Sequence, residues 1–251
     1  MKTLLIQLFI TLLLAHLISD FLLQTSILIK NKKKLPWMIF HSLIHGIAAY
    51  ALLASWTEWR APAIIALSHF LIDLVKTRLK RDNLAAFLLD QGLHLMVIIL
   101  LIVVFLFPES ITPYWFTILP ASALSVALVL TALLLLIPTG GIMIGYFVMP
   151  FQKQISEHYK KIKKEPVEGL KDGGKVIGWL ERALIFLFVL SGQFAGIGFL
   201  VAAKSVFRFG EFKESENRKE AEYIIIGTFA SFFYAILISI LAKWALGWSS
   251  N

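Results

Sequence analysis

Long apolar runs constrain this chain more than any other feature. Most of them approach or exceed the ~20 residues that a helix needs to cross the hydrocarbon core of a bilayer. Hydrophobic residues make up 58% of the 251 positions, well above the roughly 45 to 50% of soluble domains. None of the runs shows the period-two alternation of barrel strands. The sequence therefore predicts an all-α, polytopic integral membrane protein with six to seven transmembrane helices. The runs lie at about 3–29, 36–54, 62–75, 84–107, 118–150, 183–203 and 223–247.

Polar segments divide the chain into four parts. Residues 152–182 form the one long polar stretch, with eight Lys or Arg against five Asp or Glu, and we expect a basic cytoplasmic linker there. A helix lying on anionic headgroups is the alternative for its first half. We expect residues 1–110 to form a four-helix membrane bundle, 111–151 a long membrane helix or helices, and 183–251 a C-terminal membrane hairpin with a possible re-entrant segment.

The positions of the cations predict the orientation. The net charge of +8 is concentrated in loops, mainly after the first and third runs. This pattern favours a membrane protein in contact with lipid and gives no reason to expect a nucleic-acid partner. The positive-inside rule then places the N-terminus outside and these two loops in the cytoplasm.

The run at 183–203 conflicts with this rule, because both of its flanks are basic. We expect it to re-enter the membrane, with a turn at Ser191-Gly192 or at Gly196-Ile197-Gly198. A local failure of the rule, or two passes within 118–150, are the alternatives.

Four of the runs each carry two possible metal ligands four residues apart. Residues i and i+4 project from one face of a helix, so each pair is a two-atom claw. An ionisable side chain at the centre of a membrane helix costs roughly 2.5 to 3.5 kcal/mol, which favours mutual pairing or a bound cation. In the predicted topology all four pairs fall in the cytoplasmic half, with four histidines as the deeper layer. The pairs are His16 and Asp20, His41 and His45, His69 and Asp73, and Asp90 and His94.

This set of side chains suits a divalent transition metal. The chain has no cysteine, so a site rests on imidazoles and carboxylates, which favour zinc, with iron or manganese as alternatives. Eight candidates exceed the ligands of one zinc, so either two metals bind or some members orient the others. A proton or cation path and a purely structural polar network are the other readings.

Four further polar residues are candidate substrate contacts. Gln24 and Gln91 lie close to the claws in sequence, although ordinary helix–helix hydrogen bonds would explain them as well. Lys204 and Arg208 lie one turn apart and could bind a phosphate headgroup, although ordinary juxtamembrane cations often occupy such positions.

Several stretches resemble a family of bacterial integral membrane proteins of unknown function. The resemblance covers roughly the first 100 residues, and a similar likeness extends to Glu181-Arg182, Lys204 and Arg208. It implies a multi-pass protein of the bacterial inner membrane and names no activity. A weaker similarity, to membrane-bound metal-dependent hydrolases, implies zinc-type hydrolysis. The N-terminal stretches are His16-Leu-Ile-Ser-Asp20-Phe-Leu-Leu-Gln24, His41 with His45, His69-Phe-Leu-Ile-Asp73 and Asp90-Gln91-Gly-Leu-His94.

These observations favour a metal-dependent hydrolase acting on a lipid or phosphoester substrate at the cytoplasmic leaflet. The metal would activate water, and Asp20 or Asp90 would serve as general base. A divalent cation or proton transporter using the same site is the alternative from another class. An enzyme site should be closed by apolar packing on the outer side, whereas a transporter needs access from both sides.

Overall fold

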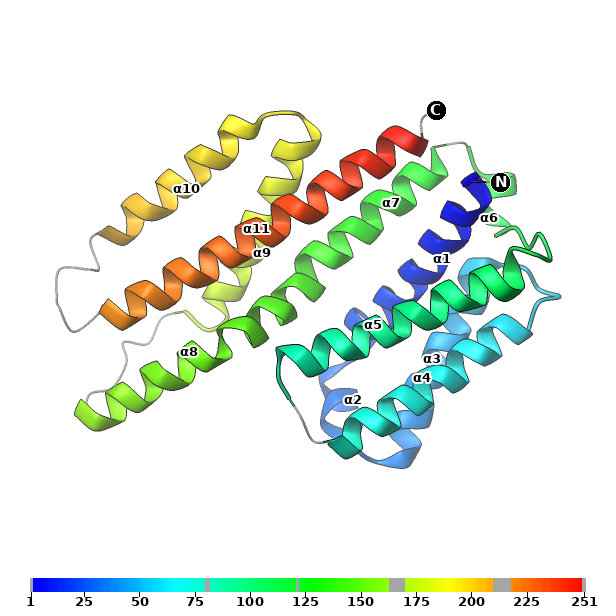
Figure 1. Ribbon diagram of the computed structural model, residues 1–251, viewed down its shortest axis with the longest axis horizontal. Helices are drawn as coiled ribbons and strands as arrows, with labels where there is room; N and C mark the ends of the chain where they lie inside the picture. The colour runs from blue at the N-terminus through cyan, green and yellow to red at the C-terminus, as the bar shows by residue number, and fades with distance from the viewer. Residues whose placement is uncertain (1, 80–81, 121, 163–169, 210–217, 250–251) are drawn as a thin grey trace. The chain divides into compact units, whose positions relative to one another are not determined.

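The computed structural model describes residues 2–79, 82–120, 122–162, 170–209 and 218–249. These residues are helical or irregular, with no strand among them, which confirms the all-α prediction (Figure 1). Two π-helical segments, η1 (Ile102–Leu106) and η2 (Leu135–Thr139), continue α5 and α7. The α-helices are α1 Lys2–Phe21, α2 Ser26–Asn31, α3 Leu35–Leu53, α4 Arg60–Leu79, α5 Leu84–Leu101, α6 Trp115–Ile118, α7 Ala123–Leu134, α8 Gly140–Ile162, α9 Gly173–Leu190, α10 Phe194–Phe209 and α11 Arg218–Ser249.

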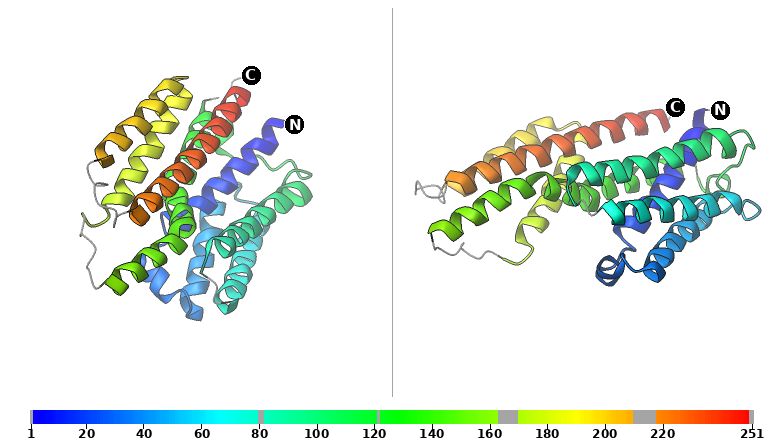
Figure 2. Two further views of the ribbon diagram at one scale, coloured as in Figure 1. Left: turned by 60° about the vertical axis from the view of Figure 1, so that its left-hand side comes forward. Right: turned by 60° about the horizontal axis from the view of Figure 1, so that its bottom comes forward.

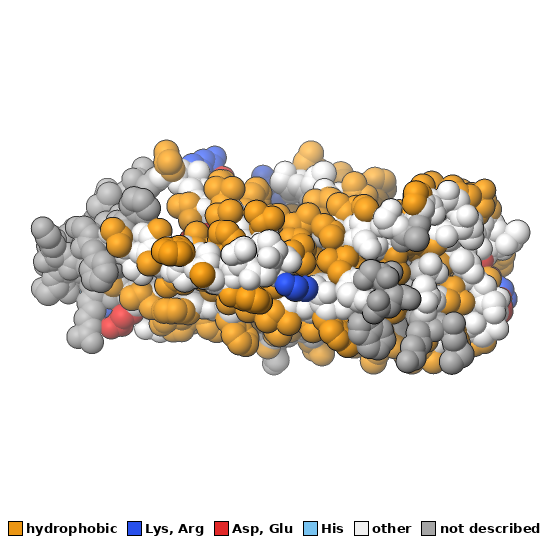
Figure 3. All heavy atoms as spheres, turned by 90° about the horizontal axis from the view of Figure 1, so that it is seen from above, with side chains coloured by type: hydrophobic (Ala, Val, Ile, Leu, Met, Phe, Trp, Pro, Cys, Tyr) orange, Lys and Arg blue, Asp and Glu red, His pale blue; other side chains and the backbone are white. Residues whose placement is uncertain are grey.

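Five helical segments within the described ranges are long and apolar enough to cross a membrane. The prediction of six to seven counted two more: α4, whose polar and charged residues lower its hydropathy, and the run at 183–203, which is not one helix. Figure 3 shows hydrophobic side chains covering much of the described surface on one face, as lipid-facing surfaces require. The five segments are Thr3–Phe21, Leu35–Leu53, Leu84–Leu106, Ala123–Lys160 and Lys219–Gly247.

The chain divides into two units, each described by itself. The first comprises Met1–Leu134 with Ala245–Asn251, and the second Leu135–Trp244. In the first unit α3 packs against α1 and α4, α4 packs against α5, and α1 also contacts α5 and α7 (Figure 2). The helices α1, α3, α4 and α5, which carry the four claws, therefore lie together as a bundle.

Small residues bring α3 and α4 close together. Gly46 of α3 faces Ala66 and Pro62 of α4 so closely that a Cβ at position 46 would lie 3.0 Å from Ala66 Cβ and 3.1 Å from the Pro62 carbonyl oxygen. Close approach through small residues is a common way for membrane helices to pack. It also places the neighbouring His45 against the residues of α4 one turn beyond Ala66.

An apolar core fills one side of this bundle. Its members come before the claw histidine in α1 and α4, and after the claw histidines in α3 and α5. In the bundle, this places all of them toward the same end of the four helices. They are almost fully buried, from 0% to 5% exposed. The core consists of Leu8, Leu12, Ala15, Ala49, Leu53, Ala61, Ile98, Leu101, Ile102 and Leu106.

In the second unit, α9 and α10 form a helical hairpin. The chain reverses at Ser191-Gly192, where Gly192 has φ of +74°, a value that favours glycine. The helix then continues through Gly196 and Gly198. The reversal brings Lys204 Nζ within 2.8 Å of the Glu181 carboxylate, a contact that a straight helix would prevent. The segment 183–203 is thus broken at one of the two positions expected from sequence, and its place in the membrane stays a prediction.

A buried arginine stabilises the irregular helix of the second unit. The π-helical segment η2 contains Pro138, which cannot donate a backbone hydrogen bond. Arg182, 3% exposed, donates to the carbonyl oxygens of Leu136 at 2.6 Å and Ile137 at 3.2 Å. Tyr234 donates to the carbonyl of Leu135 at 2.8 Å. These side chains satisfy carbonyl groups that the irregular helix leaves available.

The polar stretch at 152–182 is helical at both ends. Helix α8 extends to Ile162 and α9 begins at Gly173, after Asp172 in the left-handed conformation. Residues 163–169, in the middle of the expected linker, lie outside the described residues.

Candidate metal centre

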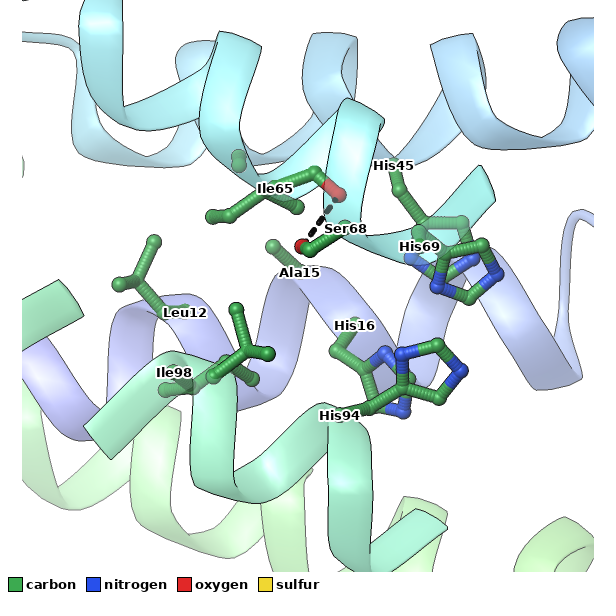
Figure 4. Close-up of a pocket in the computed structure, with 11 residues that line it drawn as sticks. Leu12, Ala15, His16, His45, Ile65, Ser68, His69, His94 and Ile98 are labelled. Carbon is green, nitrogen blue, oxygen red and sulfur yellow. Dashed lines mark hydrogen bonds between the residues drawn. The ribbon is translucent and has the colours of Figure 1, made fainter. Parts of the chain in front are cut away.

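The bundle brings all eight predicted ligands into one buried cluster. None is more than 9% exposed. The imidazole rings form a compact cluster. The separations between ring centroids are 3.5 Å for His69 and His45, 4.1 Å for His69 and His94, 4.8 Å for His41 and His45, 4.9 Å for His41 and His69, 5.1 Å for His16 and His94, and 5.3 Å for His16 and His45. Figure 4 shows four of these rings gathered from different helices. The four pairs, predicted from their helical spacing, therefore lie together at one site.

Asp20 lies at the centre of the first ligand group. Its Oδ1 is 3.1 Å from His41 Nε2, 3.2 Å from His45 Nε2 and 3.8 Å from His69 Nε2. One ligand atom from each of these four residues lies within 4.8 Å of the other three. Four ligands at 2.0 to 2.1 Å from a tetrahedral ion stand about 3.3 Å apart. The group therefore approaches the geometry of a three-histidine, one-carboxylate site.

A second group shares His69 with the first. Ligand atoms of His69, Asp73 and His94 lie within 4.8 Å of one another. His69 Nε2 is 3.4 Å from Asp73 Oδ2. Three ligands with an open position are typical of a catalytic zinc, whereas four closed ligands are typical of a structural one.

Several buried atoms of the cluster have no hydrogen-bond partner. Leaving a buried polar atom unpaired costs about 1 to 3 kcal/mol, so native structures contain few of them. Their concentration in one place fits a site whose side chains bind a cation. The atoms are His69 Nε2, His94 Nε2, Asp73 Oδ1, Asp90 Oδ1, His41 Nδ1 and His45 Nδ1.

Two lysines contact the carboxylates of the cluster. Lys32 Nζ lies 2.9 Å from Asp73 Oδ2, and Lys76 Nζ lies 2.6 Å from Asp90 Oδ2. In the sequence such loop cations indicate topology, and neither lysine was predicted as a member of the site. The one available signal was the position of Lys76, which follows Asp73 by less than one helical turn.

The two glutamines proposed as substrate contacts also lie at the cluster. Gln91 donates to Asp20 Oδ2 at 3.1 Å, and its Oε1 lies 3.2 Å from His16 Nε2. With the amide of Gln24 turned to match its neighbours, its nitrogen donates to the Asp20 carbonyl and its oxygen accepts from Lys32 Nζ, both at 3.2 Å. Both glutamines therefore bind the residues around Asp20.

The other predicted substrate contacts lie in the second unit. Lys204 is paired with Glu181. The side chain of Arg208 lies outside the described part of the structure.

A small cavity separates the histidines from the apolar core. Its volume is about 20 Å³, enough for roughly one water molecule. Figure 4 shows the imidazoles on one side of it and Leu12, Ile65 and Ile98 on the other. Ser68, which also lines it, donates to the carbonyl of Ile65 at 3.1 Å. The cluster therefore meets apolar side chains at one end and the lysines at the other.

The fold and the cluster define a class: a polytopic helical membrane protein with a buried His/Asp group that can hold a metal ion. Residues 8–121 match the model of a family described as "Protein of unknown function (DUF3307)". The matched region contains all eight candidate ligands, which confirms the resemblance over the N-terminal half. The match does not extend to the second unit. No curated protein and no solved structure matches the chain, so no named relative supports the weaker similarity to hydrolases.

Proposed function

We propose that this chain is a metal-dependent hydrolase of the bacterial inner membrane, acting on a phosphoester or similar bond of a lipid at the cytoplasmic leaflet. The observation that carries the proposal is that the two ends of the His/Asp cluster have different surroundings. Buried apolar side chains close it toward one end of the bundle, and lysines and glutamines border it toward the other. The positive-inside rule assigns the lysine end to the cytoplasm.

The four residues of the first group are the proposed metal ligands: Asp20, His41, His45 and His69. Three imidazoles and a carboxylate suit zinc, and also iron or manganese. A divalent ion held there would need a further position for water, which zinc provides when it expands to five ligands and which iron and manganese provide through their higher coordination numbers. With water in that position, the ion would act as a Lewis acid and lower the pKa of the water toward ~7. Gln91, bonded to Asp20 Oδ2, would orient that ligand carboxylate.

Asp90 is the better candidate for the general base. Asp20 has an oxygen close to three imidazoles and would serve as a metal ligand. Asp90 belongs to neither the four-residue nor the three-residue ligand group. Its Oδ1 has no hydrogen-bond partner, and its Oδ2 is held by Lys76. His94 Nε2 lies 3.6 Å from that Oδ1. An oriented carboxylate whose second oxygen makes no hydrogen bond can take a proton from an attacking water. Lys32 and Lys76 would stabilise the negative charge of a phosphoryl group.

The cluster of five imidazoles favours a second candidate function, transport of protons or a divalent cation. Neighbouring rings at 3.5 to 5.1 Å could pass a proton from one to the next. Four of the five rings, however, line the cavity that borders the apolar core, and transport requires a path through that core. The closed end therefore favours the hydrolase.

Hydrolysis in mixed micelles tests the proposal. The purified protein is supplied with zinc, iron or manganese and with bacterial phospholipids, and release of phosphate or of the headgroup is measured. Asp90→Asn should lower the rate about 10²-fold or more while keeping the metal. Ser19→Ala, which removes a buried hydroxyl bonded only to its own helix, should leave the rate unchanged. Metal-dependent ion flux in proteoliposomes without any hydrolysis would favour the transporter instead.

A further inference from the structure

A second pocket lies between α3 and α4 at their lysine-bearing ends. Its volume is about 350 Å³, within the range of small-ligand sites. Met38, 2% exposed, and Leu74 form its apolar part, together with Leu35. Thr77 lines it as well, and its hydroxyl donates to the carbonyl of Leu74. The remaining two lining residues are the cations Lys33 and Arg78.

These two cations differ from their neighbours Lys32 and Lys76. The latter are paired with Asp73 and Asp90, whereas neither Lys33 nor Arg78 has an ion pair with another residue that the structure describes. Both side chains are exposed. The pocket thus combines two available positive charges with an apolar floor.

The pocket adjoins the metal centre along the chain. Lys33 follows Lys32, Leu74 follows Asp73, and Met38 lies one helical turn before His41. A ligand bound by Lys33 and Arg78 would therefore sit beside the lysine that contacts Asp73. This position is suitable for the part of a substrate that is bound but not cleaved.

We infer that this pocket binds the phosphate headgroup of an anionic phospholipid, with the upper part of an acyl chain against Leu35 and Leu74. Guanidinium and ammonium groups bind phosphate through charge-assisted hydrogen bonds. A free phosphate would leave the apolar floor exposed to water, whereas a lipid covers it, and the basic ends of the helices lie where such headgroups are found. An anionic phospholipid would then be the substrate class of the proposed hydrolase. Its cleavage rests on the proposed function, whereas its binding in the pocket requires no metal.

Direct binding tests the pocket without turnover. Full-length protein in a nonionic detergent, without added metal, is titrated with short-chain phosphatidylglycerol, and bound lipid is counted by native mass spectrometry. The test variant is Lys33→Gln with Arg78→Gln. The matched control is Lys30→Gln with Lys34→Gln, which removes the same charge from the first basic loop but leaves the pocket residues intact.

We expect the pocket variant to bind phosphatidylglycerol about thirtyfold more weakly, since each cation near a headgroup contributes about a factor of five. The control should change by less than about twofold. Phosphatidylcholine of equal chain length should bind the wild type more weakly, and inorganic phosphate at equal concentration should not displace the lipid. Equal weakening in both variants, equal binding of phosphatidylcholine, or displacement by phosphate would each overturn the inference.

The His69→Ala protein separates this inference from the proposed function. It should bind phosphatidylglycerol as the wild type does, because His69 does not line the pocket. Lipid binding by a metal-loaded wild type that hydrolyses no lipid would contradict the hydrolase alone. Hydrolysis unaffected in the Lys33→Gln, Arg78→Gln variant would contradict the pocket alone.

Discussion

His45 of α3 and His69 of α4 lie face to face, with ring centroids 3.5 Å apart and ring planes inclined by 20°. Two protonated imidazoles at this separation would repel by about 5 kcal/mol at an effective dielectric constant of 20. The arrangement therefore favours neutral rings, the form that binds metal. Because the two rings come from different helices, their stacking depends on how closely α3 and α4 approach.

Gly46 controls that approach, so Gly46→Ala should destabilise the protein. Its new methyl group would meet the Pro62 carbonyl oxygen at 3.1 Å, and a backbone atom cannot move aside easily. We expect a loss of about 1 to 3 kcal/mol in the free energy of unfolding, together with weaker metal binding. Gly92→Ala is the control, because nothing lies within 4 Å of its added methyl group and alanine favours helix. Thermal unfolding in detergent measures both variants, and equal midpoints would refute the close contact.

Arg182→Gln should destabilise the second unit. The shorter side chain leaves the carbonyls of Leu136 and Ile137 without their donor. A buried carbonyl without a partner costs about 1 to 3 kcal/mol, so we expect a loss of about 2 to 4 kcal/mol. Chemical unfolding in micelles measures this difference. Lys171→Gln, at an exposed position, should have little effect. A similar small effect in both variants would show that Arg182 does not stabilise η2.

Thiol labelling tests the placement of the α9–α10 hairpin. The chain has no cysteine, so Ser156→Cys and Ser205→Cys each supply a single label site. If the hairpin re-enters the membrane, both positions lie in the cytoplasm and a membrane-impermeant reagent on intact cells should label neither. Labelling of Ser205→Cys with protection of Ser156→Cys would show a plain crossing. Permeabilised cells provide the positive control for reactivity.

The sequence predicted the cluster because helical periodicity alone decides which side chains share a face. A spacing of four residues puts His16 on the same helix face as Asp20, and His69 on the same face as Asp73. Because burying charge in a membrane is costly, the pairs of different helices were expected to contact one another. The break at Ser191-Gly192 was predictable for a similar reason, since glycine tolerates the positive φ that a tight reversal uses.

Other features depend on contacts between helices and could not be predicted in this way. The pairs of Lys32 with Asp73 and of Lys76 with Asp90 join residues that no local pattern connects. By length and hydropathy, two of the predicted runs are not candidate spans in the described structure, because α4 carries charges within its length and the run at 183–203 is not one helix. The role of Arg182 in satisfying η2 likewise requires the packing of α9 against that segment.

Metal analysis tests the central claim most directly. Protein purified without chelator is analysed by inductively coupled plasma mass spectrometry, with Ser19→Ala as the control for a buried polar substitution in α1. We predict at least about one transition metal per chain in the wild type and in Ser19→Ala. His69→Ala should lose most of it, because His69 belongs to both ligand groups, and Asp73→Ala should also lower it. Equal metal content in the wild type, His69→Ala and Asp73→Ala would contradict the account.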